Sequence, residues 1–287
     1  MQRRDFLGAA ALAPFVSLDA FAADATVPAF AALEKDLGGR LGVAAINLSN
    51  GKQAGHRAGE RFPLCSTFKA VLAAAILQRS ASDPSLLQRR IHYTEKDLVP
   101  HAPITGERIA KGMTVEDLCA ATVQYSDNPA ANLLMKVLGG PEAVTAFARS
   151  VGDTEFRLDR WETELNTAIP GDPRDTTTPQ AMMRSLQALV VGDALPAPQR
   201  QQLKEWLVGN TTGGKMIRAG TPAGWTVGDK TGGGAYGARN DIAVIWPPGK
   251  APIVIAIYTA HGQEDAKYRE DIIAGATRAA IALVAEA

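Results

Sequence analysis

The sequence predicts an α+β fold in which both ends of the chain contribute strands to one antiparallel sheet. Strand-like segments lie near the two termini, whereas the middle of the chain has helical periodicity. The length of 287 residues is comfortable for two domains and a sizeable core. We therefore expect a three-layer α/β/α sandwich, in which terminal helices flank the sheet, with an all-helical domain inserted between the strands.

The first strands are expected at 41–48 and 53–58, where they form a hairpin. The intervening Asn50-Gly51 pair suits a tight type I′ turn. Strand character returns near the C-terminus, at 225–230, 241–246 and 253–259, and is followed by an amphipathic helix over 266–285.

The middle of the chain repeats apolar residues at helical spacing. From residue 67 to 79, the apolar side chains fall on one face of a helix. Thr114 caps a helix over 115–125, and Pro129 lies in the first turn of a helix over 130–138. The remaining helices are expected at 142–151, 179–191 and 197–209.

These elements divide the chain into two domains. Residues 23–64 and 208–287 form the α/β sandwich, and residues 65–207 form the all-helical domain. Within the helical domain, the segment 157–178 matches neither period and is rich in proline, glycine and charge. An irregular loop of this length is usually functional.

The composition is that of an ordinary soluble globular protein. Thirty basic residues balance thirty acidic ones, the hydrophobic fraction is 46% and the charged fraction is 21%. A zero net charge argues against nucleic-acid binding and against a basic membrane-attachment surface. The four histidines lie far apart in the sequence, and two cysteines cannot build a zinc site unaided, so we expect no metal and no cofactor.

The first 22 residues have the features of an export signal. Arg3 and Arg4 precede a weakly apolar run that is shorter than the roughly 20 residues needed to cross a bilayer. Ala20 and Ala22 supply the small residues that a signal peptidase recognises. The pattern resembles a twin-arginine signal peptide and predicts a periplasmic protein. The alternative is a chance arginine pair at the start of an ordinary amphipathic helix.

Ser66 and Lys69 form an S-x-x-K pattern at the start of a predicted helix. In the first turn the lysine lies beside the serine, and the unpaired amides favour a developing anion. A lysine buried there has a lowered pKa and can act as a base. Ser49 and Lys52 share the spacing, but they flank a solvated turn, where lysine stays charged at neutral pH. The alternative role of Ser66 is that of an ordinary helix cap.

Two further motifs follow along the chain. Ser126-Asp127-Asn128 lies between two predicted helices, and Lys230-Thr231-Gly232 ends a predicted strand. Each motif is weak by itself, because Ser, Asp and Asn often cap helices and a lysine in a turn is normally solvated. The ordered set S-x-x-K, S-D-N and K-T-G is typical of penicillin-recognising serine enzymes.

With these motifs in order, the sequence resembles the class A serine β-lactamases over essentially all of the mature chain. Residues 162–166 add the Ω-loop pattern E-x-x-L-N of that family, which selects Glu162 over the neighbouring Glu164. Arg160 and Asp175 match the ion pair that closes this loop in the family. The resemblance implies the serine β-lactamase/D,D-peptidase fold. It also implies hydrolysis of the β-lactam amide of penicillins and cephalosporins, as in the broad-spectrum branch, and so antibiotic resistance.

The resemblance implies catalytic roles for five residues. Ser66 attacks the carbonyl and forms an acyl-enzyme. Ser126 relays a proton to the leaving nitrogen, and Lys69 contributes a positive field. Glu162, with Asn166 as a second anchor, activates the water that removes the acyl group. Either Lys69 or Glu162 takes the proton of Ser66 during acylation.

The resemblance also implies a binding surface for a substrate that carries a carboxylate. The carboxylate is expected to contact Lys230, Thr231 and Arg239, and Asn128 is expected to hold the acyl-amide group. The complete set of expected binding residues is Asn128, Lys230, Thr231, Gly232, Gly233, Arg239 and His101. The substrate, a β-lactam antibiotic, is the only expected partner, and the protein is expected to be a monomer.

Other features follow from the same resemblance. The backbone amides of Ser66 and Gly233 are expected to form the oxyanion hole. His101 stands at the site entrance, at a position where an aromatic residue is common in the family. Some members of the family bridge the cysteine before the nucleophile to a cysteine at the position of Gly234. Here that position is glycine, and Ala73 stands where other members carry the usual partner of Cys119, so both Cys65 and Cys119 are expected to be free and buried.

Two other functions fit part of the sequence. A penicillin-binding D,D-peptidase shares Ser66, Lys69, Ser126 and Lys230, but it lacks the equivalent of Glu162, so that its acyl-enzyme persists. A periplasmic substrate-binding protein without catalysis explains export and two domains, but it explains none of the ordered motifs.

Overall fold

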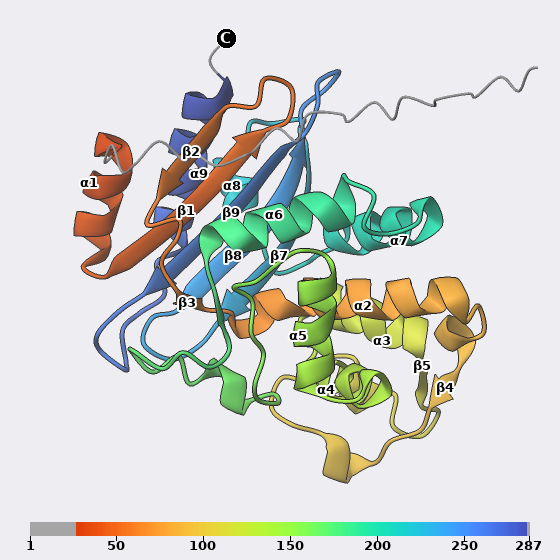
Figure 1. Cartoon of the computed structure of the whole chain (residues 1–287). Coiled ribbons are helices and arrows are strands. Elements are labelled where there is room, and N and C mark those ends of the chain that lie inside the picture. The colour runs from red at the N-terminus through yellow and green to blue at the C-terminus, as the bar shows by residue number, and fades with distance from the viewer. Residues whose placement is uncertain (1–26, 286–287) are drawn as a thin grey trace, which may run out of the picture.

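The computed structural model describes residues 27–285 and confirms the predicted α+β fold (Figure 1). The predicted export signal lies outside these residues. Five antiparallel strands form the main sheet in the order β2-β1-β9-β8-β7, so that N-terminal and C-terminal strands pair directly. The strands are β1 (Arg40–Asn47), β2 (Gln53–His56), β7 (Thr226–Gly233), β8 (Arg239–Trp246) and β9 (Ile253–Ala260).

Strand β9 shows how the sheet separates two cores. Ile255 and Ile257 face one apolar cluster, whereas Val254 and Ala256 face the other, because side chains alternate along a strand. Three helices cover the first face: α1 (Pro28–Leu37), α8 (Ile217–Gly220) and α9 (Glu270–Ala285). Helix α6 (Pro179–Val190) crosses the second face, against β1, β8 and β9 (Figure 1).

The helical part of the molecule is organised around α2 (Phe68–Ser82), which is buried over most of its length. A helix that is apolar on nearly all sides belongs in a core. It packs against the other helices of this part, which are α3 (Val115–Gln124), α4 (Asn128–Leu138), α5 (Pro141–Ser150), α6 and α7 (Ala197–Val208).

Local sequence sets the ends of these helices. The hydroxyl of Thr114 accepts a hydrogen bond from the Asp117 amide, and the Asp117 carboxylate accepts one from the Thr114 amide, which completes the cap predicted for α3. At the start of α4, Asp127 accepts a hydrogen bond from the amide of Ala130 at 2.9 Å. Gly139, with φ of 113°, ends α4.

The region between residues 65 and 207 is not wholly helical. Short strands pair within it or with its edge: β3 (Phe62–Pro63) with β6 (Thr176–Thr177), and β4 (Arg90–Ile91) with β5 (Met113–Thr114). Single 3₁₀ turns are η1 (Cys65–Thr67), η2 (Leu86–Gln88), η3 (Glu95–Asp97), η4 (Thr105–Glu107) and η5 (Glu164–Asn166). Because α6 packs on the sheet, the two parts share a broad contact, and the domain boundaries at 65 and 207 stay a prediction.

The predicted type I′ turn of the first hairpin is wrong. A type I′ turn needs positive φ at both central residues, but of Asn50 and Gly51 only Gly51 has a positive φ, at 72°. The Asn47 side chain accepts hydrogen bonds from the amide and hydroxyl of Ser49. The turn therefore begins at Asn47, before the Asn50-Gly51 pair. The backbone then closes between Asn47 and Lys52, giving a longer loop than the sequence indicated.

Two other predicted boundaries also differ from the structure. Strand β7 continues past Lys230 to Gly233, because Thr231, Gly232 and Gly233 each pair with β8. The last helix begins at Glu270, four residues later than predicted. No helix within residues 27–285 has the length and apolar character to cross a membrane.

Candidate active site

Ser66 lies in the 3₁₀ turn η1, immediately before α2, and is 7% exposed. Its neighbour Cys65 has a positive φ of 43°, a left-handed conformation that is costly for a non-glycine residue. The serine lines a cavity of about 380 Å³ between the helical part and the edge strand β7. The residues that line it are Ser66, His101, Ser126, Asn128, Asn166, Thr212, Thr231, Gly232, Gly233, Arg239 and Tyr268.

Lys69 is fully buried one helical turn after Ser66. Its Nζ lies 2.9 Å from Oε1 of Glu162, and it donates hydrogen bonds to Oδ1 of Asn128 at 2.5 Å and to the carbonyl of Ser126 at 2.8 Å. Burial lowers the pKa of Lys69, and the charge of Glu162 opposes that shift. The lowered pKa and the contact with Glu162 allow the ammonium of Lys69 to give up a proton and to take one back.

Ser126 lies between the two lysines of the site. The Nζ of Lys230 donates to Oγ of Ser126 at 3.0 Å, and the Nζ of Lys69 lies 3.5 Å from the same oxygen. Ser126 has a positive φ of 58°, so its position at the α3–α4 junction is also strained. Burial and the positive charge of Lys69 lower the pKa of Lys230 well below its usual range.

Glu162 lies in the long loop between α5 and α6 and is 4% exposed. The hydroxyl of Ser66 donates toward its Oε1 at 3.5 Å, and Nδ2 of Asn166 donates to its Oε2 at 2.5 Å. Oδ1 of Asn166 is buried without a hydrogen-bond partner in the described part of the chain, so a free acceptor lies beside the carboxylate. The rival Glu164 is exposed.

The ion pair predicted to close this loop is confirmed. Nε of Arg160 donates to Oδ2 of Asp175 at 2.5 Å, and the Asp175 side chain is nearly fully buried. The other oxygen of Asp175 accepts the backbone amides of Asp159 and Arg160. These bonds join the two ends of the loop and hold the segment that carries Glu162.

The K-T-G strand approaches the nucleophile closely. A Cβ atom at Gly232 would lie 3.2 Å from the amide nitrogen of Ser66, which explains a glycine there. Next to it, Arg239 pairs with Glu270 at 2.5 Å and stacks on Tyr268. The Nε of Arg239 is buried without a partner among the described residues, so one of its donors is free.

The remaining predicted binding residues also lie at this cavity. Nδ2 of Asn128 donates to the carbonyl of Pro100 at 2.8 Å, which fixes its amide in the cavity wall. His101 has a positive φ of 66° and its Nε2 lies 3.0 Å from the carbonyl oxygen of Tyr125. All twelve predicted residues therefore converge. Nine of them line the cavity, and the other three, Lys69, Glu162 and Lys230, contact residues that line it.

Four further residues contact the site, and the sequence motifs do not include them. Asn132 clamps Glu162, accepting its amide at 3.0 Å and donating to its carbonyl at 2.9 Å. Thr212 contacts the hydroxyl of Thr231, and Tyr268 and Glu270 contact Arg239. Only Asn132 had a sequence signal, since it follows Asn128 by four positions and therefore lies on the same face of α4.

Both cysteines are free and fully buried, as expected. Burial raises the pKa of the Cys65 thiol to about 12, so it is not ionised at neutral pH. A Cβ atom at Gly234 would lie 2.8 Å from Sγ of Cys65, which places these two positions in contact. Between residues 27 and 285, no three His, Cys, Asp or Glu side chains gather in a way that could hold a metal ion.

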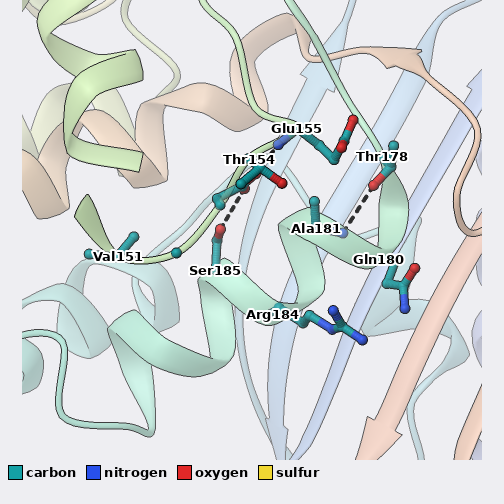
Figure 2. A pocket seen from close by; sticks show the side chains of 10 residues that line it. Val151, Thr154, Glu155, Thr178, Gln180, Ala181, Arg184 and Ser185 are labelled. Atoms are coloured by element: carbon teal, nitrogen blue, oxygen red, sulfur yellow. Dashed lines mark hydrogen bonds between the residues drawn. The ribbon is translucent and has the colours of Figure 1, made fainter. Parts of the chain in front are cut away.

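Figure 2 shows another cavity, of about 240 Å³, between the loop after α5 and the first turns of α6. Asp153, which also lines it, accepts hydrogen bonds from Oγ of Ser185 at 2.7 Å and from the amides of Glu155 and Phe156. The side chain of Thr178 accepts the amide of Ala181 and caps the helix. These bonds tie the loop to the helix, and none of the residues that line this cavity is a lysine, so it has no counterpart of the Ser66–Lys69 pair.

A serine hydroxyl beside a buried lysine and a buried carboxylate, in this two-part fold, defines a penicillin-recognising serine enzyme that works by acyl transfer. Comparison with known proteins is more specific. The profile of the β-lactamase enzyme family matches residues 26–284. The chain therefore belongs to the β-lactamase enzyme family, and hydrolysis of the β-lactam amide is confirmed over the D,D-peptidase alternative.

Individual relatives agree with this assignment and with the class A resemblance. The chain is 58% identical to the carbapenem-hydrolyzing β-lactamase KPC of Klebsiella oxytoca, over 88% of this chain and 86% of the relative. It is 55% identical to the β-lactamase Toho-1 of Escherichia coli, over 86% and 85% of the two chains. A β-lactamase structure from Desulfarculus baarsii matches with a TM-score of 0.89 and 57% identity, covering 91% of this chain and 97% of that one.

Proposed function

We propose that this protein hydrolyses penicillins and many cephalosporins through an acyl-enzyme on Ser66. The observation that supports this most is the placement of the Glu162 carboxylate. One of its oxygens faces both the Ser66 hydroxyl, at 3.5 Å, and the ammonium of Lys69, at 2.9 Å, while the other accepts from Asn166. A carboxylate in this position can serve both halves of the reaction.

In acylation, the Ser66 oxygen attacks the β-lactam carbonyl, and its proton passes to Glu162, toward which the hydroxyl already donates. The amides of Ser66 and Gly233 stabilise the oxyanion. Ser126 donates the proton that the ring nitrogen needs when the C–N bond breaks. It regains a proton from Lys69, 3.5 Å away, and Lys69 takes in turn the proton that Glu162 received from Ser66, so that Glu162 is ionised again. Lys230 and Lys69 both face the oxygen of Ser126, so the negative charge that develops there lies between two cations.

In deacylation, a water held between Glu162 and Asn166 attacks the ester. Glu162 takes one proton of this water and returns it to the Ser66 oxygen, 3.5 Å away, when the ester bond breaks. The unpaired Oδ1 of Asn166 supplies a second acceptor that orients the water. Asn132 fixes the backbone of Glu162 on both sides, so the carboxylate keeps its distance to the ester. A protein without this carboxylate would stop at the acyl-enzyme.

The substrate carboxylate is expected to lie against Lys230, Thr231 and Arg239. The buried Nε of Arg239 has an unused hydrogen, which suits an anion. Asn128 and His101 also line the cavity, where they can contact the acyl-amide group. All of these residues come from one chain, so we propose that the enzyme acts as a monomer.

Turnover of benzylpenicillin, followed together with the mass of the protein, tests the mechanism. Wild type should hydrolyse many equivalents of penicillin without accumulating an adduct. The variant Glu162→Ala should be labelled on Ser66 and then stall, with deacylation slowed by about 10²–10⁴-fold. Hydrolysis by this variant at the wild-type rate would exclude the role given to Glu162, and a stable wild-type adduct would exclude β-lactam hydrolysis itself.

We also propose that the protein reaches the periplasm through a twin-arginine signal at residues 1–22. The proposal rests on Arg3 and Arg4 before the weakly apolar run. Replacing this pair by two lysines should leave the enzyme in the cytoplasm, as measured by β-lactamase activity in periplasmic and cytoplasmic fractions. Unchanged export would indicate the general secretory route.

A further inference from the structure

A chain of side chains runs from the edge of the cavity into the buried layer behind β7. Oγ1 of Thr231 lies 2.5 Å from Oγ1 of Thr212, which lies 2.9 Å from Oδ1 of Asn210. Nδ2 of Asn210 donates to Oδ2 of Asp229 at 2.6 Å. A Cβ atom at Gly213 would collide with the same carboxylate oxygen, so the loop is held tightly over Asp229.

The buried end of this chain fixes the direction of its hydrogen bonds. The Asp229 carboxylate also accepts from Nε of Arg218 at 2.6 Å, so it is an acceptor toward Asn210. The backbone amide of Thr212 can only donate, and it donates to Oδ1 of Asn210 at 3.1 Å. The amide of Asn210 must then point its nitrogen at Asp229 and its oxygen at Thr212.

From this fixed end, the two hydroxyl protons can be placed. Oδ1 of Asn210 can only accept, and it receives both the backbone amide and the hydroxyl of Thr212. Because the Thr212 proton is used there, the oxygen of Thr212 accepts the proton of Thr231. Without substrate, Thr231 therefore presents only lone pairs to the cavity, which is the wrong polarity for a carboxylate.

We propose that Thr212 is a positioning residue for the substrate carboxylate, and that the hydroxyls of Thr212 and Thr231 reverse together when the anion binds. Thr231 then donates to the carboxylate, and Thr212 donates to Thr231. No covalent O–H bond breaks, since each hydroxyl only rotates and exchanges its hydrogen-bond partner. Asn210 keeps the backbone amide of Thr212 as a donor, so no buried acceptor is left unpaired. With substrate bound, the hydroxyls of Thr212 and Thr231 therefore donate in the same direction, toward the negative charge of the substrate carboxylate.

This inference rests on the proposed function, because the anion is the carboxylate of a β-lactam. Steady-state kinetics with benzylpenicillin and with its uncharged methyl ester test the role of Thr212 separately from the proposed function. In Thr212→Val, kcat/KM for the acid should fall about three- to tenfold with little change in kcat, because a supporting hydrogen bond is lost. For the ester it should change less than about twofold. Thr212→Ser should restore the acid to nearly wild-type values.

Thr211 provides a matched control. It is exposed, its hydroxyl donates to the carbonyl of Gln124 at 2.8 Å, and it does not line the cavity. Thr211→Val should behave as wild type with both substrates. An unchanged kcat/KM in Thr212→Val, or an equal loss for acid and ester, would overturn the inference while leaving β-lactam hydrolysis intact.

Neutron diffraction from deuterium-exchanged crystals of the free wild-type enzyme tests the resting direction without any turnover. The deuteron of Thr231 should point at Thr212, and that of Thr212 at Asn210. A deuteron on Thr212 that points at Thr231 in the free enzyme would contradict the reversal, even if Thr212→Val proves too unstable for kinetics.

Discussion

At the scale of single residues, the site depends on cations that the protein buries. Lys69 and Lys230 are both fully buried and both face the oxygen of Ser126. Two cations so close together destabilise each other, and only Lys69 has a carboxylate, Glu162, in direct contact. Lys230 is therefore the lysine more ready to lose its proton as the pH rises.

This difference gives an expectation for the pH dependence of activity. The pKa of Lys230 is lowered well below its usual range, so Lys230 loses its charge as the pH rises through that lowered value. The charge is needed to bind the substrate carboxylate. We therefore expect kcat/KM for benzylpenicillin to decline at a pH below the value of about 10.4 at which a free lysine titrates.

The variant Lys230→Arg is the control for this assignment. Arginine stays charged throughout the accessible pH range, so the alkaline decline should move to higher pH, although the larger side chain lowers kcat/KM at neutral pH. An alkaline decline at the same pH in both proteins would mean that another group is responsible.

At the scale of elements, the sequence was most informative where the signal is local. The cap of α3 needs only Thr114 and Asp117, three positions apart, and the S-x-x-K motif needs only one helical turn. The hairpin turn was predicted wrongly because the Asn-Gly pair was considered alone. The side chain of Asn47, at the end of the preceding strand, captures Ser49 and changes the loop.

Elements and contacts whose partners lie far apart in the sequence leave little trace in the local sequence pattern. The two-residue strands β3 and β6 are too short to show alternation, and they exist because the ends of the long loop meet at Asp175. Thr212 is one hydroxyl among many in the sequence. Its importance follows from lying 2.5 Å from Thr231, which only the folded chain brings about. The motif residues and the Arg160–Asp175 pair could be predicted, whereas a contact such as that of Thr212 with Thr231 could not.

At the scale of the whole molecule, the sheet lies between the active site and a cluster of side chains that stabilises the fold. The active site lies where β7 meets the helical part, whereas α1 and α9 cover the opposite face (Figure 1). On that face, Glu34 of α1 joins three segments. Its carboxylate accepts from Arg57 at 2.6 and 2.8 Å, from the amide of Leu41 at 3.0 Å, and contacts His56.

This cluster predicts how the free energy of unfolding depends on pH. Burial alone would raise the pKa of Glu34, but the hydrogen bonds and charge of Arg57 outweigh it and lower the pKa from 4.5 to about 2. Because the folded-state pKa is the lower one, the carboxylate stabilises the fold fully above about pH 4.5. That contribution is lost as the pH falls toward about 2.

The variant Glu34→Gln should therefore lower the free energy of unfolding by about 1–3 kcal/mol at pH 7, measured by urea denaturation. The difference from wild type should shrink steadily between pH 4.5 and about 2, because the unfolded wild-type chain binds a proton at Glu34 over this range before the folded protein does. Glu60→Gln is the matched control, since Glu60 also pairs with Arg57 but is 43% exposed, and its loss should cost under about 1 kcal/mol.

Penicillin turnover by folded Glu34→Gln should equal that of wild type, because the sheet lies between this cluster and Ser66. A stability difference that persists unchanged to pH 2 would show that shape, and not charge, makes Glu34 stabilising.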